Sequence, residues 1–478
     1  MAKILIVGAG FAGHFGAMTL ADQLKRKGLK SQHVITVVNR SPMFNYIPSL
    51  IWVGIGQMAP KQMQFDLRKV YAKLGIQFQV GRVFEVHPDE GFVKVETETD
   101  PAARLEYDYL MMATGPLLNF PATPGLGPDN GGYTNSVCTP PHAVHAAENY
   151  LKLVSKLEQG GQADVIVGTG HGTCTCQGAA LEYLFNVHHD LKRRGLRDRV
   201  NLTWLSNEPA LGDMGISGVE VKRGPTILSS AEAVEGIFEG YNIKWQIRSH
   251  VHKIEQDTVH YETIEGELGA KHFDFAMLLP PFKGQPITYL AADGSDITSK
   301  VCNPNGFVKV DAVYGKAYAD LDGPDWPKTY QSPVYPNIFS AGIAFAPPGP
   351  LSKPSTSPNG TVISPAPPRT GYTSELCGHA AALNIIDLLE GKTPGHSGSM
   401  AETPGLCVAS MNKSALRGNA MVIGLYPMAR NRAKYPQYGR DLDNSMIEIG
   451  LSGAWFKLFL HYAFMHKLQA RPFWRLIP

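Results

Sequence analysis

The chain has 478 residues, of which 44% are hydrophobic and 18% are charged, and its formal net charge is +2. This is a globular composition, and so long a chain predicts two or three domains. A nearly neutral charge argues against a nucleic-acid-binding protein. No uninterrupted apolar stretch of about 18 residues and no cleavable signal peptide are recognised. Six cysteines in so long a chain do not indicate a disulfide scaffold, so each is considered separately.

The first predicted elements are a strand, a glycine loop and a helix. Residues 4–7 form the apolar run Ile-Leu-Ile-Val, which is typical of a parallel strand covered on both faces. The loop Gly8-Ala-Gly10-Phe-Ala-Gly13 follows directly, and residues 15–24 are predicted to be helical. This order predicts a dinucleotide site. Gly8 would allow the tight turn, Gly10 the close approach to the pyrophosphate, and Gly13 the packing of helix on strand.

The second predicted strand, residues 33–38, ends at Asn39, and Arg40 follows. A dinucleotide fold usually has an acidic residue here that holds the ribose hydroxyls. Asn39 can still bond a hydroxyl, although without the strength of a charged acceptor. Residues 44–56 are rich in aromatic residues and glycine and are predicted to form a loop. A loop over a cofactor and a loop over the core are equally compatible with this composition.

Two further segments are expected near the same nucleotide. Within residues 75–108, apolar and polar residues alternate over several short stretches, which predicts a β-meander or hairpin insert. An apolar strand follows and ends in Ala113-Thr114-Gly115, and a later strand ends in Ala341-Gly342-Ile343. Both turns recur in two-dinucleotide-domain flavoproteins, close to the flavin, although an Asp usually stands where this chain has Ile343. Three separated segments at one nucleotide indicate FAD, because NAD usually needs only the first.

A second dinucleotide-like unit is predicted from residue 117 to 293. The strand 163–167 leads into Gly168-Thr-Gly170-His-Gly172-Thr173-Cys174-Thr-Cys176, and the helix 179–194 follows. Thr173 occupies the position of the third glycine, and the next strand, 201–205, has no acidic residue at its end. This half is therefore a degenerate NADH-type unit that has gained a thiol. A cysteine at a helix N-terminus has a stabilised thiolate and is a candidate nucleophile.

Taken together, these motifs resemble the sulfide:quinone oxidoreductase family over nearly the whole chain. The three cysteine segments of that family are matched by Ser136-Val-Cys138-Thr-Pro-Pro-His142-Ala, Cys176-Gln-Gly178-Ala-Ala-Leu-Glu182 and Leu406-Cys407-Val-Ala. Pro280-Pro-Phe282-Lys-Gly284 also matches, as does Arg369-Thr370-Gly371, where the family usually has Lys-Thr-Gly. Two features depart from the family. Asp213 replaces a frequent histidine, and Cys174 is additional, either a spare thiol or a competitor of Cys176.

The resemblance implies an FAD-dependent enzyme that oxidises hydrosulfide to zero-valent sulfur or polysulfide at the cysteine pair Cys176 and Cys407. Two electrons would pass through FAD to a membrane quinone. Glu182 would carry protons, with a solvated or capping glutamate as the alternative. The candidate catalytic residues are Cys176, Cys407, Cys138, Glu182 and His142. The candidate FAD-binding residues are Gly8, Gly10, Phe11, Ala12, Gly13, Asn39, Arg40, Ala113, Thr114, Gly115, Gly342, Ile343, Arg369 and Thr370, and no metal site is predicted.

The C-terminal end indicates how the electron acceptor is reached. No acidic residue follows Glu448, and residues 453–467 combine aromatic residues with lysines at helical spacing. Such a segment suits the surface of an anionic bilayer, with a helix packed on the protein body as the alternative. We therefore expect a peripheral, monotopic protein of the cell membrane. The sequence does not predict which face of the membrane it occupies. Leu406, Tyr435 and Tyr438 are candidates for the wall of a quinone channel.

The expected fold class is α/β, with two Rossmann-like domains and a C-terminal amphipathic-helix region for membrane association. Residues 1–116 and 294–400 would form a discontinuous FAD-binding domain, 117–293 the degenerate domain with the redox cysteine, and 401–478 the quinone and membrane region. Rival functions are an NADH:quinone flavoprotein oxidoreductase, a sulfide dehydrogenase that delivers electrons to a cytochrome, and a non-catalytic flavin-binding scaffold. Self-association into a homo-oligomer is left open.

Overall fold

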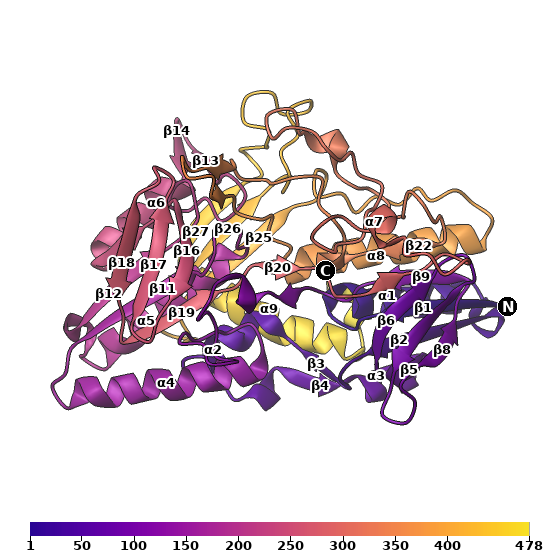
Figure 1. Ribbon diagram of the computed structural model, residues 1–478, viewed down its shortest axis with the longest axis horizontal. Coiled ribbons are helices and arrows are strands. Elements are labelled where there is room, and N and C mark those ends of the chain that lie inside the picture. The colour runs from indigo at the N-terminus through magenta and orange to yellow at the C-terminus, as the bar shows by residue number, and fades with distance from the viewer. Residues whose placement is uncertain (478) are drawn as a thin grey trace.

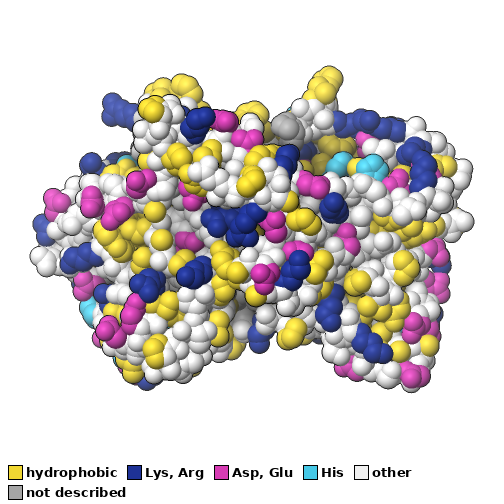
Figure 2. All heavy atoms as spheres, turned by 90° about the horizontal axis from the view of Figure 1, so that it is seen from above, with side chains coloured by type: hydrophobic (Ala, Val, Ile, Leu, Met, Phe, Trp, Pro, Cys, Tyr) yellow, Lys and Arg dark blue, Asp and Glu magenta, His cyan; other side chains and the backbone are white. Residues whose placement is uncertain are grey.

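The computed structural model, which describes residues 1–477, has three parts that meet along one seam. In Figure 1 the N-terminal part lies on the right, the part that contains β11 and β12 lies on the left, and the C-terminal strands and α9 lie between them. The predicted α/β class is confirmed. Basic and acidic side chains alternate with apolar ones over the face drawn in Figure 2, as expected for a chain with a net charge of +2.

The first part is built on a five-stranded parallel sheet with the order β22-β9-β1-β2-β5. Its strands are β1 (Ala2–Val7), β2 (His33–Asn39), β5 (Gln77–Val80), β9 (Tyr109–Met112) and β22 (Ile338–Ser340). Its helices are α1 (Phe11–Arg26), α3 (Leu67–Leu74), α7 (Thr298–Val301) and α8 (Gly371–Leu389). The short helix α2 (Leu50–Val53) belongs to the same stretch of chain but packs on helices of the second part. Because β22 pairs with β9, a segment more than 200 residues further along the chain completes this sheet.

Two local predictions in this part are wrong. The stretch from residue 75 was expected to begin a meander, but β5 pairs in parallel with β2. Polar and apolar residues alternate in β5 because it is an edge strand whose side chains are exposed or half-buried. The meander itself consists of β6 (Arg82–His87), β7 (Phe92–Glu96) and β8 (Ala103–Glu106), and β21 (Thr288–Tyr289) pairs with β6. Residues 44–56 are not a plain loop either, because they contain the end of β3 (Met43–Asn45), which pairs with β4 (Gln64–Asp66), and the buried helix α2.

The second part combines a parallel sheet, ordered β15-β12-β11-β19, with an antiparallel sheet, ordered β16-β17-β18. The parallel strands are β11 (Ala163–Thr169), β12 (Val200–Leu205), β15 (Ile243–Gln246) and β19 (Phe275–Leu279). The antiparallel strands are β16 (Ser249–Ile254), β17 (Thr258–Thr263) and β18 (Leu268–His272). The helices are α4 (Pro140–Glu158), α5 (Gln177–Arg193) and α6 (Ser230–Gly240).

The C-terminal part is a three-stranded antiparallel sheet with one long helix. Its elements are β25 (Gly405–Asn412), β26 (Asn419–Leu425), β27 (Met446–Gly450) and α9 (Leu451–Leu468). Both α5 and α9 pack on this sheet, so it joins the second part to the C-terminal helix. No helix among residues 1–477 is long and apolar enough to cross a membrane.

The remaining elements are short. The two-residue or four-residue strands outside these sheets are β10 (Leu117–Leu118), β13 (Glu220–Arg223), β14 (Thr226–Ser229), β20 (Phe282–Lys283), β23 (Ser355–Thr356) and β24 (Val362–Ile363). Short 3₁₀ helices occupy Lys30–Gln32, Ile47–Ser49, Pro60–Gln62, Phe120–Ala122, Arg197–Arg199, Gly323–Asp325, Gly342–Ala344 and Trp474–Leu476.

Candidate active site

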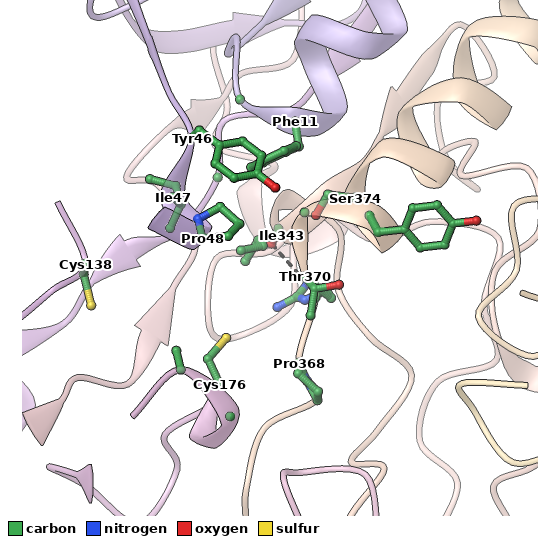
Figure 3. Close-up of a pocket in the computed structure, with 18 of the residues that line it drawn as sticks. Phe11, Tyr46, Ile47, Pro48, Cys138, Cys176, Ile343, Pro368, Thr370 and Ser374 are labelled. Atoms are coloured by element: carbon green, nitrogen blue, oxygen red, sulfur yellow. Dashed lines mark hydrogen bonds between the residues drawn. The ribbon is translucent and has the colours of Figure 1, made fainter. Parts of the chain in front are cut away.

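A cavity of about 970 Å³ lies where the three parts meet. All five candidate catalytic residues line it: Cys138, His142, Cys176, Glu182 and Cys407. Of the candidate FAD-binding residues, those that line it are Gly10, Phe11, Ala12, Arg40, Ala113, Thr114, Gly115, Gly342, Ile343, Arg369 and Thr370. Figure 3 shows Cys138 and Cys176 pointing into the space that Phe11, Tyr46 and Ile343 approach from the other side.

The geometry of the first glycine loop fits a dinucleotide. Gly8 has a φ of +102°, and a Cβ on it would lie 2.2 Å from the carbonyl oxygen of Ala113. A Cβ on Gly13 would lie 2.0 Å from the carbonyl oxygen of Gly8, which shows the tight packing of α1 on β1. Gly10 meets nothing within 4 Å and lines the cavity at the N-cap of α1, where no side chain caps the helix. The free amides at this end are thus left to a phosphate.

Asn39 has a different role from the ribose contact expected of it. Its side-chain oxygen accepts a hydrogen bond from the N–H of Ala9 at 3.1 Å, and its amide nitrogen donates to the carbonyl oxygen of Ser41 at 2.7 Å. Asn39 therefore fixes the glycine loop to the end of β2. The neighbouring Arg40 lines the cavity.

Cys176 is held in an unusual backbone conformation at the N-cap of α5. Its φ of +63° lies in the left-handed region, which is uncommon for a residue with a side chain and is a form of strain found at functional sites. Burial raises the pKa of its thiol, whereas the hydroxyl of Thr175 and the charge and N–H of Arg369 lower it. Thr175 Oγ1 lies 3.8 Å from the sulfur.

Cys407 reaches the cavity from β25 because Gly178 leaves room for it. A Cβ on Gly178 would lie 2.9 Å from the Sγ of Cys407, so the glycine of the Cys-x-Gly segment allows β25 to approach α5. Cys138 comes from the segment that precedes α4. Burial raises the pKa of both thiols to about 11. All six cysteines of the chain are free thiols in the structure.

Cys174 lies outside the cavity lining. It is fully buried, and its Sγ donates to the carbonyl oxygen of Leu279 at 3.0 Å. Burial raises the pKa of this thiol strongly. These contacts favour a structural role for Cys174 and leave Cys176 as the candidate nucleophile of this loop.

Glu182 is neither solvated nor a helix cap. It is 6% exposed, and both of its carboxylate oxygens lie 2.9 Å from the Nζ of Lys457 on α9. Lys457 also donates to the carbonyl oxygen of Val408, next to Cys407, at 2.9 Å. Burial raises the pKa of Glu182 against the opposing effect of Lys457. Sequence reasoning missed Lys457 as a site residue; the only signal was a lysine among aromatic residues in a segment without acids.

The prediction that the C-terminal lysines face lipid is wrong. The side chains of Lys457 and Lys467 are only 9% and 4% exposed, and they form ion pairs with Glu182 and Glu375. Arg475 pairs with Asp22. The acids that the C-terminal segment lacks are thus supplied by α5, α8 and α1, so the absence of local acids did not mean an unpaired basic surface.

The aromatic residues of α9 behave differently from its lysines. Trp455, Phe459 and Tyr462 are 55%, 57% and 67% exposed, and their spacing of four and three residues places them on one face of the helix. Phe473 and Leu476, just beyond the helix, are 80% and 79% exposed. Phe459 also lines the cavity, as do Phe456 and Leu460, so the cavity is continuous with this exposed aromatic face.

Two further acidic residues lie near the cavity. Asp129, which sequence reasoning missed, lines the cavity and holds His142, with 2.9 Å between its Oδ2 and the imidazole Nε2. Asp213, which stands where the resemblance suggests a histidine, is buried, and its Oδ1 accepts the N–H of Gly215 at 2.9 Å. Met214 and Ile216 on either side of that turn line the cavity, whereas Asp213 does not.

The second glycine loop has no room for a pyrophosphate. A Cβ on Gly170 would lie 2.4 Å from Leu126, and one on Gly172 would lie 2.6 Å from the carbonyl oxygen of Val362 on β24. The N–H of Gly170 donates to the carbonyl oxygen of Leu279 at 2.8 Å, and that of Gly172 donates to Nδ1 of His250 at 2.9 Å. The segment after β24 also bonds this loop, because the N–H of Ser364 donates to the carbonyl oxygen of Gly172 at 2.8 Å. A phosphate would find these amides already bonded and covered.

These features are those of a dinucleotide-binding oxidoreductase whose cavity is lined by three thiols, and the comparisons agree on the dinucleotide-binding oxidoreductase fold. The profile of the pyridine nucleotide-disulphide oxidoreductase family matches residues 2–312, so the chain belongs to that family. It is 28% identical over 417 residues to a sulfide-quinone reductase of Aquifex aeolicus, covering 87% of this chain and 83% of that protein.

A solved structure gives the same result. The chain superposes on the sulfide:quinone oxidoreductase of Aquifex aeolicus with a TM-score of 0.76 and 25% identity, covering 98% of this chain and 92% of that one. It is also 23% identical over 357 residues to a mitochondrial sulfide:quinone oxidoreductase of Schizosaccharomyces pombe, covering 71% of this chain and 68% of that protein. The resemblance inferred from the cysteine motifs is confirmed.

Proposed function

We propose that the protein is an FAD-dependent sulfide:quinone oxidoreductase. The observation that carries this proposal is the convergence of Cys138, Cys176 and Cys407, from three separate segments, on one cavity that the dinucleotide loop also lines. The similarity to proteins named for this activity supports it. A non-catalytic scaffold would need neither the three thiols nor the strained backbone at Cys176.

The proposed cycle begins after the thiols of Cys176 and Cys407, which are free in the structure, have been oxidised to a sulfur bridge: R–SH + R′–SH gives R–S–S–R′ + 2H⁺ + 2e⁻. Hydrosulfide attacks the sulfur of Cys407, which becomes a persulfide, and Cys176 leaves as a thiolate: HS⁻ + R–S–S–R′ gives R–S–SH + R′–S⁻. The two groups join again as a trisulfide when they lose one proton and two electrons: R–S–SH + R′–S⁻ gives R–S–S–S–R′ + H⁺ + 2e⁻. FAD, when bound, accepts each of these two electron pairs and makes it available to a quinone.

The reaction moves protons as well as the electrons of hydrosulfide. Reduction of a quinone takes up two protons, so HS⁻ + Q + H⁺ gives zero-valent sulfur and QH₂. Glu182 lies at the cavity, and burial raises its pKa, which favours a carboxyl group that can hold a proton. Lys457 sits against it and limits that rise, so the pair can pass a proton to the quinone and regain it.

The exposed aromatic face is the proposed contact with the membrane. Tryptophan and tyrosine are favoured at the boundary between lipid and water, and the face formed by Trp455, Phe459 and Tyr462 adjoins the opening of the cavity. A quinone could therefore enter from the bilayer without crossing water. Leu406 lines the cavity as predicted for a quinone channel, whereas Tyr435 and Tyr438 are not among the lining residues.

The test of the proposed function compares two reductants. Sulfide should bleach the flavin of the purified protein within the mixing time or shortly after, because the thiols adjoin the cofactor loop. NADH should leave it oxidised, because the second glycine loop is filled by Leu126, His250 and β24. Stopped-flow absorbance measures both. Bleaching by NADH but not by sulfide would favour the rival NADH:quinone oxidoreductase.

A second prediction concerns the aromatic face alone. Replacing Trp455, Phe459 and Tyr462 together with Ser should abolish flotation of the protein with liposomes, because each large apolar side chain contributes about 1.5–3 kcal/mol when fully buried. Bleaching by sulfide should be unchanged, and reduction of a long-chain quinone in vesicles should fall. The matched control replaces three exposed side chains elsewhere, Leu268, Val313 and Val334, with Ser. Flotation that survives the first set and not the second would place the membrane contact elsewhere.

A further inference from the structure

Arg369 is a buried cation without a carboxylate partner. It is 6% exposed and forms no ion pair with any acid among residues 1–477. Its Nη1 donates to the carbonyl oxygens of Ile343, at 3.1 Å, and Phe345, and its guanidinium carbon lies 4.9 Å and 5.1 Å from the ring centroids of Phe307 and Phe345. Its Nε is buried and has no hydrogen-bond partner in the described structure.

Other buried cations of the chain are compensated. Lys457 and Lys467 each pair with a glutamate. Arg440, 3% exposed, donates to four main-chain carbonyl oxygens, those of Ile216, Gly218, Pro427 and Met428. Arg369 has only two such acceptors, both bonded by its Nη1, and its buried Nε bonds none. A buried charge with an unsatisfied donor is costly unless an anion compensates it at some stage.

The thiol of Cys176 is one group beside Arg369 that can become an anion. The segment that carries Arg369 runs along the cysteine loop, since the N–H of Ala366 donates to the carbonyl oxygen of Cys174 at 3.0 Å. Arg369 and Cys176 both line the cavity, and in Figure 3 the sulfur of Cys176 points toward the segment of Pro368 and Thr370. The positive charge of Arg369 lowers the pKa of the Cys176 thiol.

We propose that Arg369 is the counter-ion of the Cys176 thiolate. The inference deepens the proposed function and rests on it, because that thiolate is the leaving group when hydrosulfide attacks Cys407. A leaving thiol departs faster when its conjugate base is more stable. The guanidinium is always charged near neutral pH, since burial lowers its pKa only to about 10. Arg369 thus gains a thiolate as counter-ion when the bridge opens.

The groups around the sulfur atoms of Cys176 and Cys407 favour a negative charge on Cys176. The other titratable groups near Cys176 are the thiols of Cys138, Cys174 and Cys407, each of which burial keeps protonated. The titratable groups facing Arg369 are Cys176, Cys377 and Tyr330. Cys407 lies beside the Glu182–Lys457 pair, in which Glu182 opposes a negative charge on that sulfur and Lys457 favours it. Arg369 therefore places beside Cys176 a positive charge that no carboxylate of the described residues pairs with.

The test measures the titration of Cys176 itself. The holoprotein with Cys407→Ser keeps Cys176 unbridged, and mass spectrometry of the peptide that contains Cys176 follows its alkylation by iodoacetamide against pH. In this background, Arg369→Gln should move the midpoint of alkylation at least one pH unit higher and slow the reaction about tenfold at pH values below both midpoints. Arg369→Lys, which keeps the charge, should restore most of the rate. An unmoved midpoint in an Arg369→Gln variant that retains FAD would overturn the proposal.

An internal comparison covers the case in which Arg369→Gln does not fold. In the Cys407→Ser protein with Arg369 intact, Cys176 should be alkylated at lower pH than Cys138, which has no cation beside it. Equal midpoints would also overturn the proposal. The outcome is separable from the proposed function: a lowered midpoint for Cys176 in a protein whose flavin sulfide does not bleach would support the counter-ion and refute the sulfide chemistry.

Discussion

Cys176→Ser and Cys407→Ser should each lower sulfide-dependent quinone reduction at least about 100-fold while the protein stays yellow. Neither side chain belongs to the dinucleotide loop, so FAD should be retained. The loss is large because a hydroxyl can neither form the sulfur bridge nor leave as a stable anion, and removing a nucleophile costs several orders of magnitude in other enzymes. Steady-state quinone reduction and the absorbance of the bound flavin measure the two effects.

Cys174→Ser is the matched control for this pair. It lies two residues from Cys176, in the same loop, but its sulfur is buried outside the cavity lining and bonds the carbonyl oxygen of Leu279. A hydroxyl can make the same bond, so substantial activity should remain. Activity lost in Cys174→Ser and retained in Cys176→Ser would transfer the role of nucleophile to Cys174.

The nucleotide half of the site was predictable because it depends on local sequence. Gly8 and Gly13 have the tight turn and the close packing that their spacing predicts, and Gly10 and the Ala-Thr-Gly turn line the cavity. The approach of Gly10 to a pyrophosphate stays a prediction. The convergence of the cysteines was anticipated only through the family resemblance. Nothing in the spacing of residues 138, 176 and 407 shows that they share a cavity, because β25 reaches α5 through a tertiary contact at Gly178.

The pairs of charged and titratable side chains in the site were not predictable in the same way. A lysine and a glutamate separated by 275 residues form the pair Lys457–Glu182, and no local pattern encodes such a partner. The same applies to Asp129 and His142, where the loop before α4 folds back on the helix. The basic appearance of the C-terminal segment was misleading for this reason: its charges are balanced by distant elements.

Removal of the C-terminal segment should therefore unfold the protein rather than release it from a membrane. Truncation after Glu448 deletes α9, so Glu182 and Glu375 both lose their lysine partners inside the protein. Breaking one buried ion pair costs about 3–5 kcal/mol, which is a large part of the stability of most domains. The truncation also removes the bonds from His461 to Ser49 and from His14 to the carbonyl oxygen of Leu468. The truncated protein should be insoluble or should lack FAD.

A single substitution tests the same idea without deleting the helix. Lys457→Met should lower the free energy of unfolding by about 3–5 kcal/mol in urea titration, because Glu182 is left buried and unpaired. Adding Glu182→Gln should recover most of this loss, since a neutral amide needs no counter-ion. The double variant should still be reduced by sulfide at a normal rate but be reoxidised slowly by quinone, because the group that holds the proton is gone.

A protein truncated after Glu448 that unfolds at the urea midpoint of the full chain would instead show that α9 is an independent anchor whose lysines contribute nothing to the fold.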